Sequence, residues 1–184
     1  MDSAVLLVSG SLRAGSTNTA VLRTAQSVAP PDMQSVLYDG LGALPHFNPD
    51  EDVDPLPPAV GELRTRVHQA DALVICTPEY AGALPGSLKN LLEWLIGDDH
   101  PRSVYRKPVA WINASPWGAT DAHDSLGTVL GYAHATILDE VSAEIPVAAT
   151  LIGADGEIHD QWARAQIAHV MGRLRDSLGR GTRE

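Results

Sequence analysis

The chain of 184 residues has little of what marks a secreted or membrane protein. Its single cysteine, Cys76, has no partner for an internal disulfide, which fits a reducing compartment. No apolar run reaches the roughly eighteen residues that a membrane span needs. No basic segment precedes the first apolar run, so no signal peptide is expected. These absences predict a cytoplasmic protein that does not act at a membrane.

Positive charge is also scarce. The 13 Lys and Arg residues stand against 23 Asp and Glu residues, which gives a formal net charge of −10. Binding of nucleic acid requires a broad basic face, which the sequence does not offer, so we exclude that function. A single phosphate, in contrast, requires only a local positive spot. The seven histidines are scattered without ligand spacing, so no metal site is expected.

Short apolar segments alternate with helical patterns five times along the chain. Strands are expected at residues 5–8, 34–38, 72–76, 108–112 and 141–147. Helices are expected to begin near residues 17, 60, 87, 120 and 160. This alternation predicts one α/β domain over residues 1–184, a three-layer sandwich around a five-stranded parallel sheet of order 2-1-3-4-5. Ligands of such sheets bind beyond the carboxyl ends of the strands, where the strand order reverses.

The turn after the first strand has the composition of a phosphate site. Gly10 and Gly15 permit close approach of the backbone, and the turn opens onto a helix N-terminus, which favours negative charge. The side chains that would contact the phosphate are Ser11, Arg13, Ser16, Thr17 and Asn18. An ordinary strand-to-helix turn with a capped helix is the alternative.

Two familiar nucleotide loops do not fit this turn. Ser16 stands where the lysine of a nucleotide-triphosphate loop would be. Leu12 stands where the dinucleotide fingerprint requires its second glycine. Hydroxyl groups with few glycines suit one terminal phosphate monoester, which is how flavodoxin-like folds hold FMN.

Two further loops follow neighbouring strands of the predicted sheet. Residues 77–86 contain two prolines and two glycines around one carboxylate, Glu79, and one aromatic ring, Tyr80. Residues 113–118 follow the next strand and include Trp117, whose role is open between a wall of the site and a surface anchor. Because parallel strands end at one edge of a sheet, these loops are expected to converge with the first.

Two motifs together resemble the NADPH-dependent FMN reductases, flavodoxin-like enzymes that include chromate-, quinone- and azo-dye-reducing members. The resemblance covers almost the whole chain in element order. The first motif is Gly10-Ser11-Leu12-Arg13-x-Gly15-Ser16-x-Asn18. The second is Pro78-Glu79-Tyr80-x-Gly82-x-x-Pro85-Gly86-x-Leu88-Lys89-Asn90-x-x-Glu93-Trp94.

The resemblance implies FMN held without a covalent bond, with its phosphate in the first loop and its ring against the second. By matching position, Pro78, Glu79, Tyr80, Ala81 and Gly82 would line the flavin, and the third loop would contribute Ser115 and Gly118. Ala81 departs from the pattern, because many relatives carry Asn there.

The implied function is transfer of hydride from NADPH or NADH to FMN and then to a small acceptor by a ping-pong mechanism. The acceptor is a quinone, an azo dye, a metal oxyanion or a flavin. No catalytic side chain is expected, because the flavin supplies the chemistry. An FMN-binding electron carrier or sensor is the main alternative, and a silent phosphate-binding scaffold is a third.

Two segments bear on access and assembly. Residues 39–57 form a long loop, expected to be either a mobile surface excursion or a lid over a ligand. Trp94 lies beyond the apolar stripe of the third helix, so it is expected to pack against another subunit, with packing in the chain's own core as the alternative. Together with the small-residue segment 126–135, it predicts a homodimer or homotetramer with the flavin near a subunit boundary.

Overall fold

The strands pair side by side in a computed structural model that describes residues 2–181. Residue 1 and residues 182–184 of the expected domain lie outside the described residues. The strands are β1 (Ser3–Ser9), β2 (Met33–Tyr38), β3 (Ala72–Cys76), β4 (Pro108–Asn113), β5 (Thr136–Ile137) and β6 (Ala143–Glu144). They form a parallel sheet of order β2-β1-β3-β4-β5, and β6 also pairs with β4. The predicted strand order is therefore confirmed.

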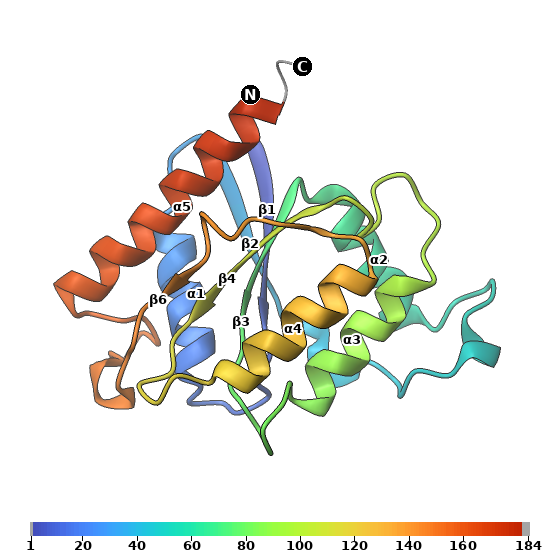
Figure 1. Ribbon diagram of the computed structural model, residues 1–184, viewed down its shortest axis with the longest axis horizontal. Coiled ribbons are helices and arrows are strands. Elements are labelled where there is room, and N and C mark those ends of the chain that lie inside the picture. Colours follow the sequence, from blue (N-terminus) through green and yellow to red (C-terminus); the bar gives the residue numbers. More distant parts are fainter. Residues whose placement is uncertain (1, 182–184) are drawn as a thin grey trace.

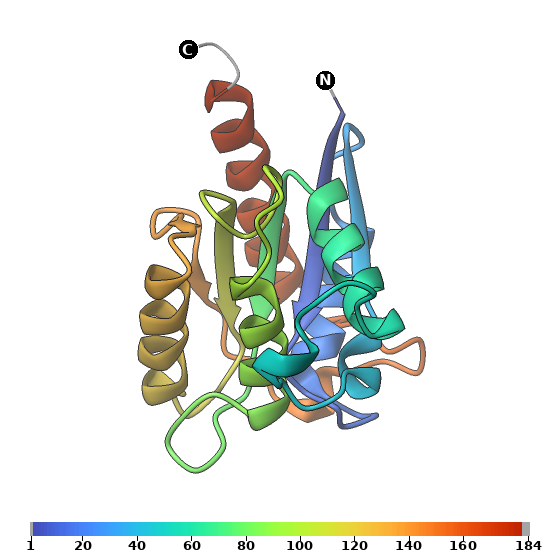
Figure 2. The same ribbon diagram turned by 90° about the vertical axis from the view of Figure 1, so that its right-hand side faces the viewer.

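Helices cover both faces of the sheet, as Figures 1 and 2 show. The helices are α1 (Thr17–Ser27), α2 (Pro58–Gln69), α3 (Gly86–Ile96), α4 (Thr120–Tyr132) and α5 (Gln161–Gly181). Leu7 and Val74 face α1 and α5, whereas Leu6 and Leu73 face α2, α3 and α4. Both faces are buried at the centre of the sheet, so β3 and residues 4–8 of β1 are apolar throughout rather than alternating. Among the described residues, no helix combines the length and the apolar character that crossing a membrane requires.

The fifth strand differs from the predicted segment 141–147. It consists of two short pieces, β5 and β6, that pair with β4 before and after an outward excursion of the chain. The excursion carries Asp139 and Glu140, which are exposed, because a buried sheet position offers their carboxylates no partner. The hydroxyl of Ser142 accepts a hydrogen bond from the Trp111 amide at 3.1 Å, in place of a backbone partner.

The long loop 39–57 packs onto α3, so neither expectation for it, a mobile excursion or a lid, describes its contacts. Trp94 is fully buried beneath it, and its indole nitrogen donates to the carbonyl of Pro45 at 2.9 Å. The ring of Phe47 meets Trp94 edge-on, with 5.0 Å between the ring centroids. The expectation that Trp94 contacts another subunit is therefore wrong, because the chain's own loop covers it.

A buried guanidinium fixes this loop to the end of α3. Arg64 on α2 donates twice to the Trp94 carbonyl, at 3.0 and 2.7 Å, and once to the carboxylate of Asp52 at 2.7 Å. The side chains of both charged partners are about nine-tenths buried, since 10% and 12% of their surfaces are exposed. Removing one partner of such a pair leaves an uncompensated buried charge, so these contacts hold the loop in place.

The loop after β3 turns back on itself and projects beyond the end of the sheet (Figure 1). Tyr80 and Ala83 exchange two backbone hydrogen bonds, at 3.1 and 3.2 Å. The two residues between them, Ala81 and Gly82, have φ angles of 53° and 69°. A two-residue turn with positive φ at both positions favours Asn-Gly, and alanine at the first position is strained.

Replacing Ala81 is expected to stabilise the protein. Ala81→Asn and Ala81→Gly should each raise the free energy of unfolding by about 1 kcal/mol, because both residues adopt positive φ more readily than alanine. Urea unfolding measures the change. Ala83→Gly, in the same turn but without positive φ, is the control and should not stabilise. If Ala81→Asn and the native protein are equally stable, the backbone strain inferred at Ala81 is wrong.

Candidate functional site

Three loops meet at the carboxyl ends of β1, β3 and β4, at the lower edge of the sheet in Figure 1. They border a crevice with a volume of about 320 Å³. Gly10 brings the first loop against the end of β3, where its amide donates to the Cys76 carbonyl at 2.9 Å. A Cβ at Gly10 would overlap the side chain of Thr77, so only glycine permits this approach. The crevice is lined by Thr17, Asn18, Pro78, Glu79, Ala114, Ser115, Pro116, Trp117, Ala119 and Val147.

The N-terminus of α1 points at the first loop. Ser16 caps the helix, and its hydroxyl accepts from the Thr19 amide at 3.4 Å. The amides of Thr17 and Asn18 have no hydrogen-bond partner within the described chain. Two unpartnered amides at the positive end of a helix favour an anion. The terminal phosphate of FMN fits this cradle.

Arg13 and Ser11 complete the cradle. The Ser11 hydroxyl is buried and accepts from the Arg13 amide at 3.3 Å, which holds the loop in a tight turn. The Arg13 guanidinium donates to the carbonyl of Gly15 at 3.0 Å and is otherwise exposed. Its remaining donors are free for phosphate oxygens, with which guanidinium forms charge-assisted hydrogen bonds.

Asn18 is oriented by the cysteine that ends β3. The Cys76 thiol donates to the Asn18 side-chain oxygen at 3.2 Å. Burial raises the pKa of the Cys76 thiol far above its ordinary value, so it stays protonated and serves as a packing group and donor. The amide nitrogen of Asn18 is left for a ligand in the crevice.

Glu79 connects the second loop to the third. Its carboxylate accepts from the Ala122 amide at 3.2 Å, in the first turn of α4. The residue before α4, Ala119, has a φ of 48° and provides no side-chain cap, so Glu79 supplies the missing acceptor from another loop. This contact places a carboxylate at the crevice, beside the positive end of the α4 dipole.

Asn113 holds the third loop at both ends. Its side-chain oxygen accepts from the Ser115 amide at 3.1 Å, and its side-chain nitrogen donates to the Gly118 carbonyl. Within the loop, the Ser115 hydroxyl accepts from the Trp117 amide at 3.2 Å. The backbone is therefore fixed, yet the Trp117 side chain is 94% exposed.

The structure brings most of the predicted residues to one edge of the sheet. Thr17, Asn18, Pro78, Glu79 and Ser115 line the crevice. The other predicted residues lie outside its lining, on the same three loops: Ser11, Arg13, Ser16, Tyr80, Ala81, Gly82 and Gly118.

Four lining residues were missed from the sequence: Ala114, Pro116, Ala119 and Val147. Small apolar residues carry no chemical signal, and Val147 reaches the crevice only through the interrupted fifth strand. The Val147 amide donates to the Ala114 carbonyl at 3.0 Å, which draws that segment to the end of β4.

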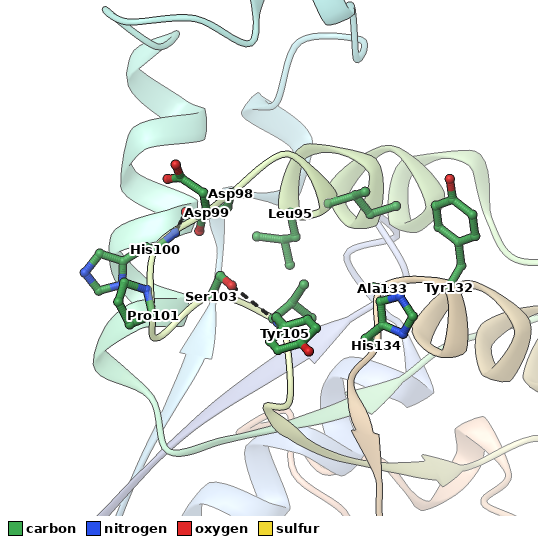
Figure 3. Close-up of a pocket in the computed structure, with 12 residues that line it drawn as sticks. Leu95, Asp98, Asp99, His100, Pro101, Ser103, Tyr105, Tyr132, Ala133 and His134 are labelled. Atoms are coloured by element: carbon green, nitrogen blue, oxygen red, sulfur yellow. Dashed lines mark hydrogen bonds between the residues drawn. The ribbon is translucent and has the colours of Figure 1, made fainter.

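A second pocket, of about 350 Å³, opens at the opposite end of the sheet (Figure 3). The C-termini of α3 and α4 meet there, with Asp98 and Asp99 on one side and Tyr132 and His134 on the other. Helix C-termini and carboxylates both disfavour a phosphate. The crevice at the carboxyl ends of the strands is therefore the candidate cofactor site.

Comparison with known proteins gives one consistent assignment. A model of the NADPH-dependent FMN reductase family matches residues 3–150. An NAD(P)H-dependent FMN reductase of Pseudomonas aeruginosa is 35% identical over 169 residues, 90% of each chain. A 2-hydroxy-1,4-benzoquinone reductase of a Burkholderia species is 31% identical over 170 residues, 91% of each chain. FerB, a flavoenzyme NAD(P)H:(acceptor) oxidoreductase from Paracoccus denitrificans, matches with a TM-score of 0.83 at 28% identity, covering 97% of this chain and 98% of FerB.

The family match includes both predicted cofactor loops, and the likeness to FerB extends over the three-layer flavodoxin-like fold. The expected resemblance, the enzyme class and the use of FMN with a reduced nicotinamide are thereby confirmed. The chain belongs to the NADPH-dependent FMN reductase family of oxidoreductases.

Proposed function

We propose that the enzyme passes electrons from NADPH or NADH, through FMN in the crevice, to a small organic acceptor, with quinones the first choice. The observation that carries this proposal is the unpartnered pair of amides at Thr17 and Asn18, beside Arg13 and open to the crevice. Quinones come first because relatives similar over most of the chain include a benzoquinone reductase. Azo dyes, metal oxyanions and free flavins are the further acceptors to be tested.

The three loops have separate roles in this proposal. The cradle of Ser11, Arg13, Ser16, Thr17 and Asn18 binds the phosphate. The isoalloxazine lies against residues 78–82, with Ser115 and Gly118 at the third loop. FMN held by these loops would supply the redox chemistry, namely hydride uptake from the nicotinamide and two-electron reduction of the acceptor.

No side chain of the described crevice is assigned as an acid or base. Glu79 already accepts from the α4 amide, and Cys76 is a protonated thiol. The protein therefore binds, orients and limits access to the cofactor. If nicotinamide and acceptor use the same open side of the crevice in turn, the kinetics are ping-pong.

The first experiment separates an enzyme from a carrier. We expect the purified protein to show flavin absorbance that bleaches on anaerobic addition of NADPH or NADH and returns when a quinone is added. Initial rates at several concentrations of both substrates should give parallel double-reciprocal lines. A protein that binds FMN but is never bleached by nicotinamide would be the electron carrier or sensor instead.

The phosphate cradle gives a sharper prediction. Arg13→Ala should weaken FMN binding about ten- to a hundredfold, because a hydrogen bond to a charged group contributes about 1.5–3 kcal/mol. Riboflavin, which lacks the phosphate, should bind Arg13→Ala and the native protein equally weakly. Fluorescence titration of the apoprotein with each flavin measures both constants.

The control is Arg23→Ala, which removes another exposed arginine, on α1 and outside the cradle. It should leave FMN affinity unchanged. Ser16→Ala is less suitable, because Ser16 also caps α1 and its loss would lower stability. Tight binding of riboflavin to the native protein would show that the phosphate is held elsewhere.

We also propose that residues 1–184 act as one FMN-binding domain in the cytoplasm and assemble as a homodimer or homotetramer. Support for assembly now comes from α4 rather than from Trp94. A Cβ added at Gly127 or Gly131 would meet no heavy atom within 4 Å, so this face of the helix is uncovered. Tyr132, at the end of the same helix, is 75% exposed.

Sedimentation tests the assembly. The native protein should sediment as a multiple of the 19.6 kDa chain at micromolar concentration. Gly131→Glu should shift it toward the monomer by placing a charge on the uncovered face. Gly172→Glu, at an equally open position on α5, is the control and should not. If the native protein is a monomer and fully active, the proposed assembly is wrong.

A further inference from the structure

Trp117 combines a rigid backbone with a side chain that touches almost nothing. Asn113 holds the ends of its loop, and the Ser115 hydroxyl accepts from its own amide at 3.2 Å. Yet 94% of the residue is exposed, the highest value among the large apolar residues described. A large ring exposed to water on a loop whose backbone is fixed is suited to a ligand that covers it.

The indole lies beside the cofactor crevice, of which Trp117 forms part of the wall. The same wall includes Ser115, Pro116 and Ala119, while Pro78 and Glu79 come from the loop after β3. Tyr80, on that second loop, is also half exposed, at 52%. Tyr80 lies outside the lining of the crevice, so Trp117 is the aromatic residue of that lining.

Charge at this crevice favours a neutral ligand over an anion. The carboxylate of Glu79 lines it, and no basic residue is among the described residues of its lining. Arg13 is engaged at the phosphate cradle. An anionic acceptor would meet the Glu79 carboxylate, whereas a neutral planar ring would cover apolar surface of Trp117 and Pro116.

We propose that Trp117 is the specificity-determining residue for the electron acceptor, binding the ring of a neutral planar aromatic acceptor beside the cofactor. The inference rests on the proposed function, since it assumes FMN in the crevice. The indole stacks on the acceptor and leaves the phosphate cradle unchanged. Acceptors without an aromatic ring do not use it.

The test uses the oxidised FMN-loaded protein and menadione, a neutral quinone, without nicotinamide. Titration followed by flavin absorbance should give a dissociation constant about tenfold higher in Trp117→Ala than in the native protein. Trp117→Phe, which keeps an aromatic face, should raise it less than about threefold. The matched control is Trp162→Ala, which removes a 54% exposed tryptophan from α5 and should change nothing.

Steady-state rates provide the second readout. For menadione, Trp117→Ala should raise KM about tenfold with little change in kcat. For ferricyanide, an acceptor without a ring, KM should change less than about twofold. FMN content and the rate of bleaching by NADH or NADPH are measured beside these rates, so that a change at the cofactor is distinguished from a change in acceptor binding.

Four outcomes would overturn the inference: an unchanged menadione constant, an equal loss for menadione and ferricyanide, loss of FMN from Trp117→Phe, or an altered sedimentation of that variant. The last two would place Trp117 in the cofactor site or in a subunit interface. If the proposed function itself fails, NADPH and NADH will not bleach the flavin absorbance of the native protein. That result is distinct from any effect of the Trp117 variants. Menadione binding needs no nicotinamide, so it tests Trp117 in either case.

Discussion

The site depends on how closely the first loop approaches the end of β3. Gly10 has no side chain, so its amide reaches the Cys76 carbonyl at 2.9 Å beneath Thr77. That hydrogen bond positions the start of α1 beside the end of β3. There the Cys76 thiol donates to the side chain of Asn18 and orients it. The helix N-terminus consequently opens toward the crevice, and its dipole acts where the phosphate is proposed to bind.

Contacts between loops then give the rest of the crevice its shape. Glu79 from the second loop accepts from the first turn of α4, and Asn113 closes the third loop on itself. Each of these side chains forms a hydrogen bond with a backbone group. Separating the two partners would leave a partly buried polar group without a hydrogen bond, which lowers the stability of the fold. The bonded segments are therefore held in place. The loops are therefore positioned before any ligand binds, which lowers the ordering cost of binding.

The sequence was sufficient for features that depend on local pattern. Alternating apolar runs and helical stripes predicted the layers and strand order, and the glycines of the turn 10–18 predicted its place between β1 and the start of α1. Features that depend on distant contacts were out of reach. Trp94 looked unpartnered because its partners, Pro45 and Phe47, come from an irregular loop with no pattern of its own. The first piece of the fifth strand, β5, was likewise missed, because two residues before Asp139 and Glu140 are too short a run to predict a strand.

The buried thiol of Cys76 has a consequence for an enzyme that handles quinones. Quinones are electrophiles that add to thiolates, and this chain contains a single cysteine. That residue has no exposed surface, its pKa is raised by burial, and its proton is held by Asn18. The protein therefore offers its proposed substrates no thiol to alkylate, so repeated turnover would not inactivate it by that route.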